Sequence, residues 1–149
     1  MKIFVDADSC PAKVRNAVQK KSIQFNINLF FVANREIKFT EQSDLFKMIV
    51  CENKTGSADD YIFTNSSEGD LVITKDLPLA ERLLKKNVTV INDRGTVFSP
   101  EVLKKMLQQR EESMLMKACG VNTGARFNSY GQKELTDFYN CFIKVLEKR

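Results

Sequence analysis

Aspartates are the residues of this sequence whose type and spacing best suit chemistry. Asp6 and Asp8 follow a short apolar run, Asp59 and Asp60 are adjacent further along, and Asp76 follows another apolar run. Carboxylates within ~4–6 Å of each other raise one another's pKa, so a cluster of them is usually neutralised by a cation. Oxygen ligands alone favour Mg²⁺ or Mn²⁺. The sequence therefore predicts a site for one or two such ions, with Asp6, Asp59 and Asp76 as ligands.

The sequence of 149 residues contains no histidine. Ser-His-Asp triads, Cys-His dyads and His-rich zinc sites are therefore excluded. The four cysteines, Cys10, Cys51, Cys119 and Cys141, are too widely spaced for a paired zinc-ligand pattern, and we expect them to be reduced and mostly buried. Cys10 is a remote alternative nucleophile, because the start of a helix would lower its pKa.

Composition limits the class of protein. The chain is 43% hydrophobic with a formal net charge of +4, which is compatible with a polyanionic partner. No run approaches the ~20 apolar residues that a membrane span needs, and the N-terminal run becomes acidic too early for a secretory signal. We expect a cytoplasmic protein with no membrane partner, and a single domain over residues 1–149.

The acids must be positioned by strands and helices that alternate along the chain. Apolar runs predict strands at residues 2–5, 27–33, 45–51, 70–74 and 88–91. Helices are predicted to begin near Pro11, at a capping-box-like segment over residues 57–60, and at Pro78. This alternation predicts an α/β fold with a mostly parallel sheet covered by helices on both faces.

The C-terminal third is predicted to be helical. One helix from Ser99 carries an apolar stripe of Leu103, Met106, Leu107 and Met114. A last helix carries Leu135, Phe138, Tyr139, Phe142 and Val145 at helical spacing. We expect this last face to pack in the core, with a homodimer or partner face as the alternative. Residues 120–131, which include Arg126, are predicted to form a surface loop whose role the sequence leaves open.

We expect the site at the carboxyl ends of the strands, because that is where ligands of open α/β sheets bind. Asp6 and Asp76 occupy such positions, and the helix that begins near Asp59 leads to the same edge. Each acid also has a structural alternative: Asp8 as the cap of the helix at Pro11, Asp59 and Asp60 as partners of their own helix dipole, and Asp76 as the residue that fixes the turn before Pro78.

Three further residues are predicted to contact nucleic acid. Asn34, Lys75 and Arg94 follow neighbouring strands, and lysine and arginine are usual partners of phosphate oxygens. The alternative is that they are solvated surface. The partner expected from these residues is RNA or another single-stranded nucleic acid.

Several motifs resemble, in order, those of the bacterial YaiI/YqxD family. They are Val5-Asp6-Ala7-Asp8-Ser9-Cys10-Pro11, Val32-Ala33-Asn34, Ala58-Asp59, residues 69–80 around Thr74-Lys75-Asp76-Leu77-Pro78, and Asn92-Asp93-Arg94-Gly95. The family is grouped with PIN-like domains, so the resemblance implies a three-layer α/β/α sandwich, followed here by C-terminal helices, and kinship with metal-dependent ribonucleases. By motif position, Asp6, Asp59 and Asp76 correspond to the acids of that site. Asp93 stands where the family often has proline, and Ala125-Arg126 where Gly-Gly-Pro is common.

The expected function is therefore that of a metal-dependent nuclease with Asp6, Asp8, Asp59 and Asp76 as catalytic residues, Asp8 being an outer ligand or a water-positioning base. One alternative is a haloacid-dehalogenase-like phosphatase, in which Asp6 is the nucleophile and Asp8 the general acid. The early position of Asp59 and Asp60 argues against it, because that family places its metal-binding acids last. The other alternative is a non-catalytic module that binds RNA or protein.

Overall fold

The computed structural model describes residues 1–120 and 130–148, and strands and helices alternate along much of this chain. The described strands are β1 (Lys2–Asp6), β2 (Asn28–Ala33), β3 (Phe46–Val50), β4 (Leu71–Ile73) and β5 (Thr89–Ile91). The described helices are α1 (Ala12–Phe25), α2 (Ser57–Asn65), α3 (Leu77–Lys85), α4 (Pro100–Ala118) and α5 (Gln132–Glu147). All five predicted strands are thus confirmed, with ends that shift by a residue or two.

The strands form one parallel sheet in the order β3-β2-β1-β4-β5. β1 lies at its centre and is buried on both faces. Ile3 and Val5 point into one core and Phe4 into the other, because successive side chains of a strand alternate. The pairings between these strands are all parallel, and an isolated bridge between Ile91 and Val97 is antiparallel, so the sheet is mostly parallel as predicted.

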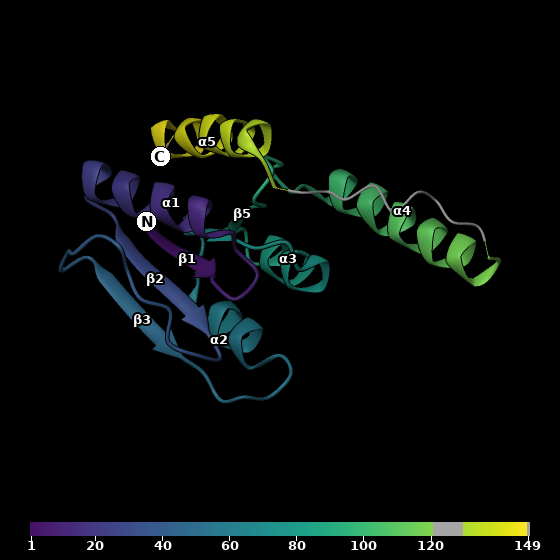
Figure 1. Ribbon diagram of the computed structural model, residues 1–149, viewed down its shortest axis with the longest axis horizontal. Helices are drawn as coiled ribbons and strands as arrows, with labels where there is room; N and C mark the ends of the chain where they lie inside the picture. Colours follow the sequence, from purple (N-terminus) through teal and green to yellow (C-terminus); the bar gives the residue numbers. More distant parts are fainter. Residues whose placement is uncertain (121–129, 149) are drawn as a thin grey trace.

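Helices cover both faces of the sheet, so the fold is the predicted three-layer α/β/α sandwich (Figure 1). α1 and α5 pack on one face, where Val14, Val18, Phe138 and Phe142 are buried. α2, α3 and the first half of α4 pack on the other. The expectation that the last helix packs in the core is therefore correct for its two phenylalanines.

The order of strands reverses between β1 and β4. The chain proceeds from β1 outward to β2 and β3, and then returns to the other side of β1 with β4 and β5. Val5 pairs with Ile73, which sets Asp6 and Thr74 side by side at the carboxyl edge. Such a switch point is where open α/β sheets form their ligand sites.

Some local predictions were wrong. α2 begins at Ser57 after Gly56 and has no side-chain cap, so residues 57–60 do not form a capping box. Met114 lies on the apolar stripe identified in the sequence, but it is 63% exposed, because α4 extends beyond the sheet. The cysteines are free, as expected, but only Cys10 is buried, and Cys119 is exposed.

The predicted loop over residues 120–131, with Arg126, lies almost entirely outside the described residues. None of the helices within residues 1–120 and 130–148 is long and apolar enough to cross a membrane.

Candidate functional site

Asp6 is the central acid of the carboxyl edge. It ends β1 and is buried, and its Oδ2 accepts hydrogen bonds from Ser9 Oγ at 3.1 Å and Thr74 Oγ1 at 3.2 Å. Burial raises the pKa of Asp6; the two hydrogen bonds oppose this rise, and the charges of Asp76 and Asp8 add to it. Two hydroxyl groups thus fix the orientation of a carboxylate that burial destabilises.

Asp76 follows β4 and caps α3. Its Oδ1 accepts a hydrogen bond from the Leu79 backbone N–H at 2.9 Å, and its own N–H donates to Thr74 Oγ1 at 3.1 Å. The structural alternative predicted for Asp76 is therefore correct. It does not remove Asp76 from the site, because a capping aspartate uses one oxygen for the helix and the other remains to interact elsewhere.

Asp59 lies in the first turn of α2 and is half-buried. The pKa of Asp59 is raised from an ordinary 3.8 to about 6; burial is the largest cause, and the charges of Asp76 and Asp6 and a hydrogen bond to Asp76 act in the same direction. A hydrogen bond between two carboxyl groups requires a proton on one of them. Three acids predicted to converge do therefore influence one another at this edge.

The donor set fits a hard divalent cation, because it consists of carboxylate oxygens and a cation would offset the mutual repulsion of these acids. The described acids do not form a complete coordination site for a metal ion. Across residues 1–120 and 130–148, no group of three or more acidic or cysteine side chains has the geometry of a metal site. Asp76 and Asp6 both act on Asp59 through their charges, which places the three carboxyl groups near one another at this edge.

Asp8 has a different role from the cap that was considered for it. Its Oδ2 accepts from the Asn34 backbone N–H at 2.9 Å, and its Oδ1 lies 3.4 Å from Arg35 Nε. The helix that follows has Pro11 at its N-cap position and no side-chain cap. Asp8 therefore joins the segment after β1 to the segment after β2, and so holds Asn34 at the edge.

The segment after β5 is tied to α5. Asn92 Oδ1 accepts hydrogen bonds from the backbone N–H groups of Arg94 and Thr96, and the carbonyl oxygen of Asp93 accepts one from Tyr130 Oη at 2.6 Å. Arg94 Nη1 lies 3.7 Å from a carboxylate oxygen of Glu134. Asp93 is buried, and it does not take part in the contacts between Asp59 and Asp76.

The three predicted phosphate contacts lie at the carboxyl ends of β2, β4 and β5, as their sequence positions implied. Asn34 and Lys75 are exposed, and the Arg94 side chain is 39% exposed. Lys75 also borders a cavity of about 10 Å³ beside Asp6 and Cys10, with room for about one water molecule. Their position is therefore compatible with phosphate binding, which stays a prediction.

Cys10 is unsuited to the nucleophilic role considered for it. The pKa of its thiol is raised to about 12, chiefly by burial and to a lesser extent by the nearby Asp93 carboxylate. The expected lowering by the helix start does not occur, since desolvation outweighs it. Ser9 is the site residue that sequence reasoning missed. A serine three residues after an aspartate at a strand end often bonds back to it, and this was the available signal.

A parallel α/β sandwich with interacting acids at its switch point is the class of protein that the fold and the site define. The model of a family described as "Uncharacterized BCR, YaiI/YqxD family" matches residues 4–148, so the chain belongs to the YaiI/YqxD family.

The relatives are bacterial proteins of similar length. A UPF0178 protein of Treponema denticola is 41% identical over 148 residues, covering 99% of this chain and 93% of the relative. UPF0178 proteins of Aliivibrio salmonicida and Pseudoalteromonas atlantica are each 34% identical, covering 99% and 100% of this chain and 97% and 100% of those relatives. No solved structure matches.

Proposed function

We propose that this protein is a metal-dependent nuclease that hydrolyses phosphodiester bonds of RNA or another single-stranded nucleic acid. The observation that carries the proposal is the placement of Asp59 beside Asp76 and Asp6, where burial first and then the charges of these two acids raise the Asp59 pKa to about 6. Perturbed acids that converge from separate elements mark functional sites more often than surface acids do. The grouping of the YaiI/YqxD family, which the motifs resemble, with PIN-like domains supports the same chemistry.

Asp6, Asp59 and Asp76 would hold one or two Mg²⁺ or Mn²⁺ ions. When bound, such an ion activates water and neutralises charge on phosphate oxygens. Ser9 and Thr74 keep one oxygen of Asp6 oriented. Asp8 acts as a positioning residue, because both of its oxygens are engaged by Asn34 and Arg35.

The test is an assay of purified protein with Mg²⁺, Mn²⁺ or EDTA on labelled RNA, single-stranded DNA and a generic phosphomonoester. We expect metal-dependent cleavage of RNA that falls by more than about 100-fold in Asp59→Asn and Asp76→Asn, since even outer-shell losses can reach that size. Asp60→Asn is the matched control, because Asp60 is adjacent, exposed and paired with Arg82 at 3.2 Å.

Metal binding is measured separately by thermal unfolding. About 10 mM Mg²⁺ against a dissociation constant of about 1 mM would stabilise the wild type by about 1.4 kcal/mol, or roughly 3–6 °C. Asp76→Asn should gain less, while asparagine still caps α3. Equal and negligible shifts in both proteins would contradict the metal site.

The alternatives give different results in the same assay. Turnover of the phosphomonoester alone, abolished by Asp6→Asn and accompanied by a trapped aspartyl-phosphate, would indicate the phosphatase. RNA binding without cleavage under either metal would indicate a binding module. The phosphatase requires Asp8 to donate a proton, whereas both Asp8 oxygens accept hydrogen bonds in this structure.

A further inference from the structure

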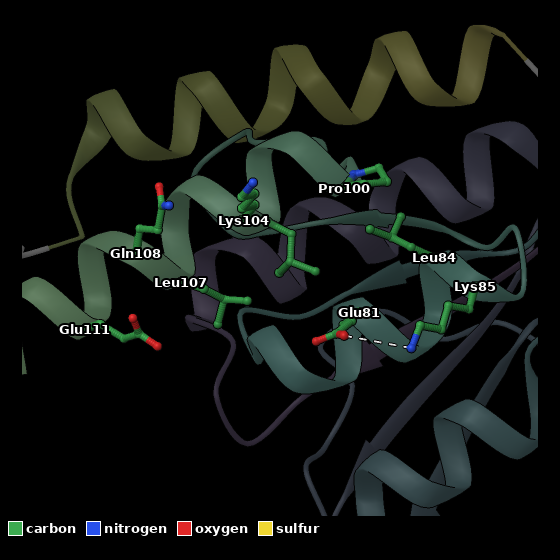
Figure 2. Close-up of a pocket in the computed structure, with 9 residues that line it drawn as sticks. Glu81, Leu84, Lys85, Pro100, Lys104, Leu107, Gln108 and Glu111 are labelled. Carbon is green, nitrogen blue, oxygen red and sulfur yellow. Dashed lines mark ion pairs between the residues drawn. The ribbon is translucent and has the colours of Figure 1, made fainter.

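A groove lies between α3 and α4 and is lined by residues of both helices. It has a volume of about 470 Å³ and an apolar floor of Leu84, Leu103 and Leu107. Figure 2 shows Leu84 and Leu107 between the two helices, with charged side chains along the rim. The volume is roughly three times that of a cavity known to hold a benzene molecule, at ~150 Å³. It can therefore take more than one large apolar side chain.

The second half of α4, from residue 108 to residue 118, exposes apolar side chains to solvent. Every residue from 108 to 120 is exposed, and Met114 and Leu115 are 63% and 67% exposed. α4 extends beyond the sheet in Figure 1, and its last contribution to the core is Leu107. A helical segment of this length is marginal in water without a partner.

The exposed residues continue the face of α4 that lines the groove. Positions 103, 107, 111, 114 and 115 recur at the spacing of one helix face. The second half of α4 cannot reach its own groove, because Met114 lies seven residues, or about 10 Å, beyond Leu107 on the same helix. A second copy of the chain can supply it.

We infer that two copies pair through α4 in antiparallel orientation, each placing Met114 and Leu115 in the α3–α4 groove of the other. The charges on the rim favour this arrangement. Lys104 and Glu111 are exposed and lie on the same side of the helix. A two-fold axis midway between them brings each Lys104 against Glu111 of the partner subunit, as an isologous interface requires. The same axis sets Leu115 level with Pro100 of the partner subunit, at the far end of the groove.

The pairing does not depend on the proposed nuclease activity, and charge reversal tests it. The chain mass is 17.1 kDa, so light scattering or sedimentation should report twice that value for the wild type. Lys104→Glu and Glu111→Lys should each raise the dimer dissociation constant at least about tenfold, because like charges then face each other. The double variant should return it to within about threefold of wild type, since both pairs are restored.

A matched pair of variants tests the apolar contact. Leu115→Ser should weaken the dimer, whereas Met116→Ser should not, because Met116 is 46% exposed on the opposite face of the same helix. Circular dichroism of each variant checks that α4 still forms. A wild type that stays monomeric at about 100 μM would overturn the inference. A dimer that survives both charge reversals and Leu115→Ser would overturn it as well, since it would use another surface.

Discussion

The carboxyl group of Asp59 makes the stability of the metal-free protein depend on pH. Its pKa is about 6 in the folded protein, against 3.8 for an ordinary aspartate. The folded state therefore binds the proton more tightly than the unfolded state does. The stabilisation is fully present below about pH 4 and is lost as pH rises through about 6. Asp6, whose pKa burial also raises, acts in the same direction.

We accordingly expect Asp59→Asn to reduce the loss of stability between about pH 5 and pH 7.5 in EDTA. The difference in melting temperature from wild type should be about 1–3 °C, a modest value because solvent screens a half-exposed group. Asp60→Asn serves as the control, since its side chain is 71% exposed. Thermal scans at both pH values measure the effect. Parallel pH profiles for all three proteins would show that Asp59 titrates normally.

The residues of the site differ in how far their sequence positions predicted their contacts. Asp6 and Asp76 were predictable, because a residue that ends a parallel strand must reach the carboxyl edge. The contact of Asp59 with Asp76 depends on where α2 packs, and no local signal specifies that. The structural alternative considered for Asp8 was a cap on the nearest helix, whereas its carboxylate accepts a hydrogen bond from Asn34, 26 residues away. A short polar side chain bonds to a residue that is distant in sequence when the fold brings a better donor close to it.

At the scale of elements, the turn between β5 and α4 joins the site to α5. Gly95 has a φ of +83°, and a Cβ atom there would lie 2.4 Å from the carbonyl oxygen of Asp137 in α5. The same turn carries Arg94 and Asn92. Glycine at this position therefore permits both the backbone conformation and the close approach of α5.

Gly95→Ala should destabilise the protein by about 2–4 kcal/mol, combining left-handed backbone strain with displacement of α5. Gly69→Ala separates the two contributions. Gly69 also has a positive φ, of +91°, but nothing lies within 4 Å of its Cβ position. That variant should lose only about 1–2 kcal/mol. Urea unfolding measures the free energy of unfolding of both variants. Equal losses would mean that α5 can shift to accommodate the added methyl group at no cost in free energy.

The elements themselves were predictable from the sequence because their signals are local. Continuous apolar runs at residues 70–74 and 88–91 predicted β4 and β5, although each strand has only three residues. The order of strands was not predictable, because it depends on which side of β1 the chain returns to. The exposure of Met114 was not predictable for a related reason: spacing placed it on an apolar face of α4, but spacing does not identify what lies against that face.

At the scale of the whole molecule, a net charge of +4 gives little general attraction to nucleic acid. Binding would have to depend on a few basic groups at the carboxyl edge. Lys75 and Arg94 lie there, but they differ in their side-chain contacts. Arg94 pairs with Glu134 and faces the Tyr130 ring at 5.9 Å, so its removal would also disturb the start of α5. Lys75 is exposed and is the cleaner position to change.

We expect Lys75→Ala to weaken the binding of single-stranded RNA and to reduce the dependence of log affinity on log salt by about 0.7 per lost phosphate contact. Lys20→Ala is the matched control. Lys20 is also an exposed lysine, on α1, about 12 Å along the helix from its start at the carboxyl edge. Both variants lose one charge, so only a local contact can separate them. Fluorescence anisotropy over a salt series, in EDTA to prevent cleavage, measures the slopes. Equal slopes in the two variants would mean that RNA is attracted by net charge alone, and the carboxyl edge would then lose its assignment as the nucleic-acid surface.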